Sequence, residues 1–161
     1  MYGMKIRIST VFVLLMVCLF GQVANANPWV VKLTAIQGGS CDSFGGGWTD
    51  FAYDGKSNIK FCKQVSISQP QFVITDIIGY FPGNVTCNLK FGNDWSAFAY
   101  DGKARITFCM KKERLEIDTK YISDVNAFVG TSACKSVFGD NGWKNVIYNG
   151  YSNITFCAKF E

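Results

Sequence analysis

The chain has 161 residues, a formal net charge of +4 and a hydrophobic fraction of 48%. This composition excludes an intrinsically disordered protein. The chain has no histidine, which excludes the Ser-His-Asp and Cys-His catalytic constellations.

Residues 1–26 have the features of a secretory signal peptide. Lys5 and Arg7 precede an apolar run over 11–20, and Ala24-Asn25-Ala26 offers the small residues of a cleavage site. One alternative is a retained transmembrane anchor, for which the apolar run is too short. The other is a lipoprotein signal at Cys18, but the bulky Val17 stands where that signal has a small residue. We therefore expect a mature chain of residues 27–161 with no membrane span. It would be secreted, either extracellular or, in a bacterium, periplasmic.

The mature chain carries little net charge. Loss of Lys5 and Arg7 lowers the 16 basic side chains to 14, against 12 acidic ones. The basic residues are scattered along the sequence, and only Lys111, Lys112 and Arg114 are close together, with an acid among them. This field is too weak to indicate nucleic acid or an acidic membrane as the partner.

Three copies of one frame follow, Cys…Gly…Trp-x4-Tyr-x-Gly-x3-Ile-x-Phe-Cys, over residues 27–67, 68–117 and 118–161. The spacing from Trp to the closing Cys is identical in all three, which identifies an internal repeat. The frame residues are Cys41, Trp48, Tyr53, Gly55, Ile59, Phe61 and Cys62; Cys87, Trp95, Tyr100, Gly102, Ile106, Phe108 and Cys109; and Cys134, Trp143, Tyr148, Gly150, Ile154, Phe156 and Cys157.

The frame contains six cysteines, because the seventh, Cys18, belongs to the signal peptide. An even number in a secreted chain indicates a disulfide framework. The repeat favours pairing within each copy, and pairing between copies is the alternative. The absence of histidine and of any C-x2-C pair argues against a zinc site, so we predict no metal and no other cofactor. The predicted bonds are Cys41–Cys62, Cys87–Cys109 and Cys134–Cys157.

Each copy contains three strand signals. An apolar stretch precedes the first Cys, the second strand runs from Trp to Tyr, and the third is Ile-x-Phe-Cys, in which side chains alternate between two faces. An Asp-Gly or Asn-Gly pair between the second and third strands predicts a tight hairpin turn. The turn residues Asp54 and Asp101 are equivalent, and we expect them to serve backbone geometry rather than catalysis. The apolar stretches are 30–36, 72–78 and 127–130, and the turn pairs are Asp54-Gly55, Asp101-Gly102 and Asn149-Gly150.

The fold class is therefore predicted to be all-β. No segment has a sustained helical period, and even the polar link 110–124 alternates at Leu115, Ile117, Thr119 and Tyr121, which predicts a further strand. Modules this short cannot each bury an adequate core. We expect one domain with pseudo-threefold symmetry, similar to a β-trefoil or a β-prism, because closure removes sheet edges. Three small β modules in tandem are the alternative.

The tryptophans of the frame are candidate ligand contacts. Each follows a loop rich in glycine, Asn or Asp, and an indole ring beside such a loop can stack on a sugar while the polar side chains bind hydroxyls. The alternative is that each tryptophan anchors the core. The candidate residues are Trp48, Trp95, Trp143, Asn93, Asp94 and Asn141.

The function these features favour is a non-enzymatic, lectin-like module that binds glycans through up to three weak sites, which gain avidity by linkage. One alternative is a protein-interaction module, an inhibitor or effector that docks through the 111–120 segment or the loop at Pro82-Gly83. Another is a structural protein of a coat or matrix. Asn84-Val85-Thr86 fits the N-glycosylation sequon and follows a Pro-Gly turn, so Asn84 is a candidate acceptor.

Overall fold

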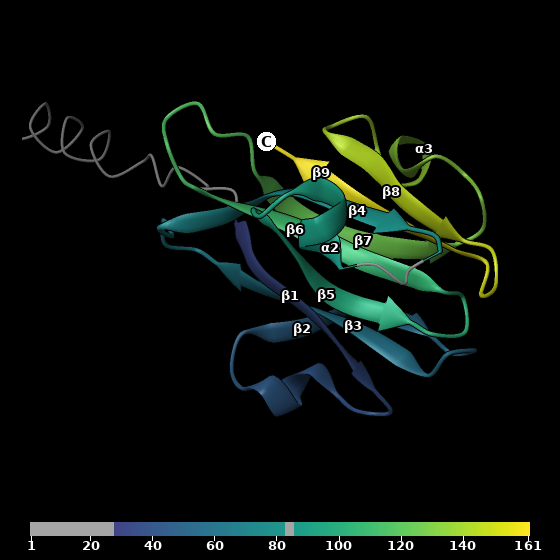
Figure 1. The fold of residues 1–161 in the computed structure, drawn as a ribbon. Helices are drawn as coiled ribbons and strands as arrows, with labels where there is room; N and C mark the ends of the chain where they lie inside the picture. Colours follow the sequence, from purple (N-terminus) through teal and green to yellow (C-terminus); the bar gives the residue numbers. More distant parts are fainter. Residues whose placement is uncertain (1–27, 83–85) are drawn as a thin grey trace, which may run out of the picture.

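The computed structural model describes residues 28–82 and 86–161, so the signal peptide 1–26 and the sequon at Asn84 lie outside the described residues. The fold is all-β, as predicted, and consists of three similar antiparallel sheets with one short helical turn each (Figure 1). None of the helical segments in the described ranges is long and apolar enough to span a bilayer. The elements are β1 Trp29–Gln37, η1 Cys41–Phe44, β2 Trp48–Asp54 and β3 Ile59–Ser66; β4 Phe72–Tyr80, α2 Cys87–Phe91, β5 Trp95–Asp101 and β6 Ile106–Arg114; and β7 Ile122–Val129, α3 Cys134–Phe138, β8 Trp143–Asn149 and β9 Ile154–Phe160.

Every sheet has the same strand order. The strand that contains Ile-x-Phe-Cys lies in the middle, which gives the orders β1-β3-β2, β4-β6-β5 and β7-β9-β8. Each second strand has a bulge at the same place, at Phe51, Phe98 and Val146. A bulge reorients the side chain of the extra residue, and these three side chains pack against the hydrophobic core.

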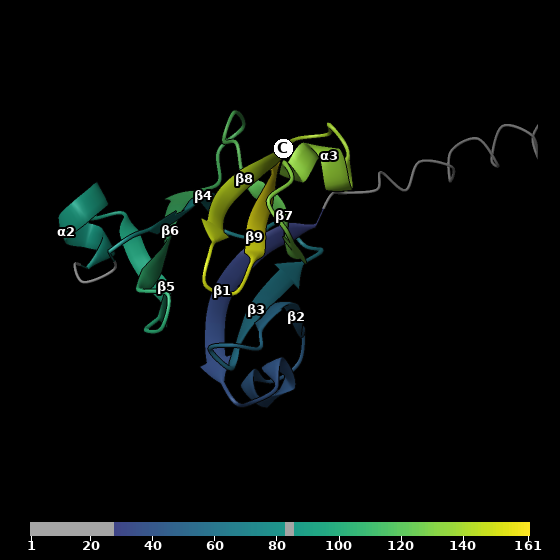
Figure 2. The ribbon, with the colours of Figure 1, turned by 90° about the vertical axis from the view of Figure 1, so that its right-hand side faces the viewer.

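The three sheets contact one another in a cycle. Strand β2 of the first repeat packs on β7 of the third, β5 of the second on β1 of the first, and β8 of the third on β4 of the second. Figure 2 shows the sheets grouped around a common centre, with the three helical turns pointing outward in different directions. The three modules thus pack against one another as well as following one another in tandem.

The core is shared among the repeats. Three phenylalanines from the middle strands, Phe61, Phe108 and Phe156, meet edge to face, with ring centroids 4.8–5.0 Å apart for all three pairs. Edge-to-face contact is a preferred arrangement of aromatic rings. The second cluster lies among the first strands of the sheets, with Val30, Leu33, Ile74, Ile77, Ile122, Val125 and Ala158 buried together. Because both clusters draw on all three repeats, no repeat buries its apolar face alone. The specific β-trefoil or β-prism assignment is not confirmed, since each sheet has only three strands.

The prediction of a strand across the 110–124 link is wrong for 115–121. The β6 strand ends at Arg114, and the chain then makes a turn in which the Thr119 N–H donates to Glu116 O at 3.2 Å. The Thr119 hydroxyl also accepts from the Glu116 N–H at 2.9 Å. Local side-chain bonds of this kind compete with strand pairing, and Ile117 is left fully exposed at the corner of the turn.

Candidate functional site

The three disulfides are those that the repeat spacing predicts. They join Cys41 to Cys62, Cys87 to Cys109 and Cys134 to Cys157. In every repeat the bond connects the first residue of the short helical turn to the middle strand. Each helical turn is therefore fixed covalently to its own sheet.

The tryptophans of the frame begin the second strands and are half-buried. Each indole packs against the phenylalanine that ends the preceding helical turn, with centroid distances of 5.3 Å for Phe44–Trp48, 5.2 Å for Phe91–Trp95 and 4.7 Å for Phe138–Trp143. In the second repeat this aromatic pair also packs against the buried cluster of Tyr80, Cys87 and Cys109. The tryptophans thus form a small aromatic layer outside each sheet, apart from the shared core.

The polar residues proposed to assist them lie in the preceding loops. Asn93, Asp94 and Asn141 are all exposed, and the Asp94 carbonyl accepts a hydrogen bond from the Lys112 N–H at 3.4 Å. Because the helical turns point outward in different directions (Figure 2), the structure does not bring the three tryptophan sites together.

The turn residues Asp54, Asp101 and Asn149 are fully buried and meet at the centre of the three repeats. Each uses its Oδ1 to accept backbone N–H groups of its own turn, as expected of turn residues. In addition, Nδ2 of Asn149 lies 3.0 Å from Asp54 Oδ2 and 3.0 Å from Asp101 Oδ2. One amide therefore bridges the two carboxylates of the other repeats, a contact that the sequence analysis did not predict.

Two serine hydroxyls complete this cluster. Ser57 of the first repeat donates to Asp101 Oδ1 at 2.8 Å, and Ser152 of the third repeat donates to Asp54 Oδ2 at 2.5 Å. The equivalent position in the second repeat is Ala104, which would face the amide of Asn149. Each carboxylate thus receives a hydroxyl from another repeat, and the amide receives none.

The charge of Asp101 is stabilised by these bonds. Burial raises the pKa of Asp101, but hydrogen bonds from the Ala104 backbone and from the Ser57 and Asn149 side chains outweigh burial, so its pKa lies below the usual value. Solvent does not reach either carboxylate, which leaves no room for a substrate beside them. The two carboxylates link the three repeats by accepting hydrogen bonds across them.

The three hairpin turns lie directly over this cluster and bond to one another. Lys56 Nζ donates to Tyr151 O at 2.6 Å, and Lys103 Nζ donates to Lys56 O at 2.6 Å. Figure 1 shows the turns 55–58, 102–105 and 150–153 gathered at its right-hand side. We call this surface the turn end of the molecule. It exposes one equivalent tyrosine from each repeat, Tyr53 at 54%, Tyr100 at 53% and Tyr148 at 43%.

An open groove of about 490 Å³ lies beside Tyr53. The Tyr53 hydroxyl donates to Asn58 Oδ1 at 3.2 Å, which positions the ring at the edge of the groove. Among the described residues, neither the Asp50 carboxylate nor the Lys60 ammonium has an ion-pair partner. The groove is lined by Gly38, Gly39, Asp50, Tyr53, Asn58 and Lys60.

The other repeats lack this free set of polar groups. In the third repeat, Asn145 stands where the first has Asp50, and its Oδ1 accepts the Cys134 N–H at 2.8 Å. In the second repeat the same position is Ala97. The position of Lys60 is taken by Thr107 and Thr155, both buried. The groove beside Tyr53 is thus a feature of the first repeat.

The sequence did not reveal this groove because the ligand contacts were sought beside the tryptophans that all copies share, in the loops that precede them. The useful signal lies in the differences between the copies. At two outward positions of the frame, the first repeat carries the charged residues Asp50 and Lys60, whereas the other repeats carry uncharged ones. Within residues 28–82 and 86–161, no three acidic or cysteine side chains are grouped in a way that could hold a metal ion. The chain matches no known protein-family model and no curated protein.

Proposed function

We propose that the protein is a secreted, non-enzymatic, lectin-like module that binds a glycan in the groove beside Tyr53. The observation that carries this proposal is an exposed aromatic ring in the same hollow as a carboxylate, an amide and an ammonium group. Pyranose rings stack their C–H faces on aromatic rings, and their hydroxyls bond to such polar groups. Asp50 and Lys60 are available for such bonds because neither forms an ion pair within the part of the chain that the structure describes.

Secretion is supported by the sequence of the leader and by the cysteine chemistry. All six cysteines of the described chain form disulfides, and disulfides persist in oxidising compartments. A non-enzymatic role is supported by the same bonds, since a disulfide leaves no thiolate nucleophile. The buried carboxylates Asp54 and Asp101 are closed to a substrate as well.

The tryptophan sites remain a prediction. One face of each ring packs on a phenylalanine, so a sugar would have to use the rest of the ring, with help from the neighbouring loop residues Asn93, Asp94 and Asn141. The groove supports the proposal better because its polar side chains and its aromatic ring line one hollow.

The test is a glycan array probed with the oxidised protein and with two matched variants. Tyr53→Ala removes the ring of the groove. Tyr100→Ala removes an equally exposed ring in the repeat that has Ala97 in place of Asp50. We expect Tyr53→Ala to lose about tenfold or more in affinity, which corresponds to ~1.4 kcal/mol. Tyr100→Ala should stay close to wild type, with both melting temperatures unchanged. Equal losses, or none, would contradict a site at Tyr53.

A second candidate function is docking of another protein at the turn formed by 116–119. The observation in its favour is Ile117, which is fully exposed on a turn closed by Thr119. Hollows of about 820 Å³ and 380 Å³ flank this turn. Ile117→Asp should abolish such binding and leave glycan binding intact, whereas Tyr53→Ala should do the opposite.

A further inference from the structure

The turn end gathers basic side chains that lie far apart in the sequence. Lys56, Lys103 and Arg105 belong to the turns themselves, and Lys60 lines the adjoining groove. Three of them are exposed and Lys60 is half-buried. They come together because the repeat places equivalent turn positions of different copies around one centre, as Figure 2 shows for the hairpins.

These cations remain available to a ligand. Lys56 and Lys103 each use one N–H on a backbone carbonyl, and an ammonium group has three. Lys60 has no ion-pair partner among the described residues. The Arg105 guanidinium lies over the exposed Phe81 ring at 5.7 Å and forms no ion pair within the described residues.

Little negative charge opposes them at this surface. The groove and the three turns contain one exposed acid, Asp50. Asp54 and Asp101 lie buried beneath the turns, where hydrogen bonds from all three repeats engage their oxygens.

The other exposed acids of the described chain lie outside the groove and the turns. Glu116 and Asp118 lie on the loop at 115–121, which Figure 1 shows at the upper left, opposite the turns. Asp76 and Glu113 line the same hollow. Lys111 and Lys120 also line that hollow and offset part of its negative charge, and Lys111 forms an ion pair with Glu113. The net positive charge of the turn end would attract an anionic ligand.

We infer that the glycan is acidic, with sulfate or carboxylate groups, and that it lies across the turn end with one sugar in the groove beside Tyr53. This inference rests on the proposed glycan binding. The exposed rings of Tyr148 and Tyr151 offer further stacking surfaces, and the basic side chains form charge-assisted hydrogen bonds with the acidic groups. A neutral glycan would use the rings and leave the cations unpaired.

The experiment compares matched glycans on the oxidised protein. The first pair is a heparin-type oligosaccharide and its desulfated form, and the second is a polyuronate and its methyl ester. We expect the charged member of one pair to bind at least about tenfold more tightly. Raising the salt concentration should weaken that binding, because ion pairs at a surface are screened.

The variants test the location of the charge. Lys56→Gln, Lys103→Gln and Arg105→Gln together should lower affinity for the charged glycan about tenfold or more and reduce its salt dependence. The matched control, Arg114→Gln, Lys120→Gln and Lys135→Gln, removes the same charge at exposed positions outside the turns and should change affinity less than about twofold. Lys56 and Lys103 also hold the turns together, so Lys60→Gln serves as a second variant, since Lys60 Nζ makes no ion pair in the described chain.

Three outcomes would overturn the inference, and they differ in whether they also refute the proposed glycan binding. Equal binding of charged and neutral glycans, still lost in Tyr53→Ala, would refute an acidic ligand and leave the proposed function intact. Absence of any glycan binding would refute both. Equal affinity for duplex DNA or phosphatidylserine vesicles, lost in the same turn variant, would show a general anion-binding surface in place of a glycan site.

Discussion

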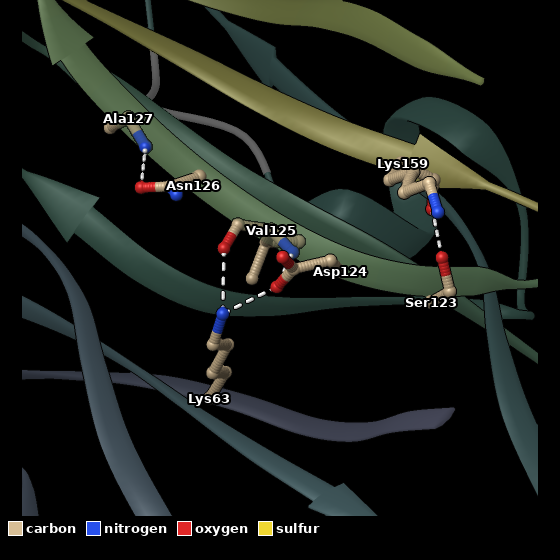
Figure 3. Close-up of polar contacts among 7 residues, drawn as sticks. All are labelled: Lys63, Ser123, Asp124, Val125, Asn126, Ala127 and Lys159. Carbon is tan, nitrogen blue, oxygen red and sulfur yellow. Dashed lines mark hydrogen bonds and ion pairs between the residues drawn. The ribbon is translucent and has the colours of Figure 1, made fainter. Parts of the chain in front are cut away.

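Lys63 and Asp124 form an ion pair between the first repeat and the third. Lys63 Nζ donates to Asp124 Oδ1 and, at 3.0 Å, to Val125 O (Figure 3). The Lys63 side chain is largely buried, with 17% of its surface exposed. The equivalent positions in the other repeats are Met110 and Ala158, so this contact occurs once and distinguishes one interface from the other two.

Lys63→Ala should destabilise the fold by about 1–2 kcal/mol, because it leaves a partly buried carboxylate without its cation and removes a bond to Val125 O. The measurement is urea unfolding of the oxidised protein. Lys63→Met, which introduces the residue of the second repeat, should cost less than Lys63→Ala because it keeps the packing of the side-chain stem. A loss below about 0.3 kcal/mol for Lys63→Ala would contradict a role for the pair.

Because the pKa of Asp101 is lowered on folding, we expect the free energy of unfolding to fall in acid. Its pKa is lowered in the folded state, with burial opposed by the hydrogen bonds described above, so its contribution is fully present above its ordinary value of 3.8. That contribution is lost as the pH falls below this value and through the lower folded pKa. Unfolding free energies from pH 6 to pH 2.5 should fall more steeply below pH 4 for wild type than for Asp101→Asn. Parallel curves would refute the assignment.

Gly79 lies where the second repeat packs tightly against the third. A Cβ built at this position of β4 would lie 2.6 Å from Cγ2 of Ile147 in β8, which requires a shift of a packed side chain. Gly79→Ala should therefore destabilise by about 1–3 kcal/mol, the usual cost of overpacking.

Ile147→Val should recover part of that loss in the double variant, because it removes a methyl group at the point of contact. Gly102→Ala is the matched control, since its Cβ would meet Tyr100 at an ordinary 3.5 Å. The measurement is a thermal melt of the wild type, the three single variants and the double variant. Additive effects of Gly79→Ala and Ile147→Val would exclude direct contact.

Because the tryptophans are half-buried, their replacement should cost less stability than loss of a core residue and more than loss of a surface residue. Trp95→Ala removes a ring that packs on Phe91 and against the buried cluster of Tyr80, Cys87 and Cys109. We expect a loss of ~2 kcal/mol, below the 3–5 kcal/mol typical of a fully buried aromatic residue. Iodide should quench the fluorescence of Trp95 partially in the native state and fully in urea. Unchanged stability would show that the ring is free for a ligand.

The frame repeated three times made much of the fold predictable. Strand alternation, Asp-Gly turns and cysteine spacing are local signals, and they gave the hairpins and the disulfide pairing. The helical turns were missed because a single turn such as Cys87–Phe91 is too short to show a helical period. The 115–121 segment was misassigned because alternation alone does not supply a partner strand.

The site was harder to predict because it depends on contacts between copies. Asp54 and Asp101 were correctly interpreted as turn residues, but their meeting with Asn149 follows from the packing of three sheets. Lys56, Lys103 and Arg105 look scattered in the sequence for the same reason. Only the arrangement of the repeats around one centre brings them to one surface.

The buried cluster also gives the repeats a fixed order. Ser57 of the first repeat serves the carboxylate of the second, and Ser152 of the third serves that of the first. The second repeat has Ala104 at the equivalent position, opposite the amide of Asn149, which carries no charge and receives no hydroxyl hydrogen bond. A chain built from three copies of the first repeat would enclose three carboxylates with no amide between them. The copies have therefore diverged into parts that are no longer interchangeable, and a loss or exchange of one repeat would leave the centre of the protein with mismatched polar groups.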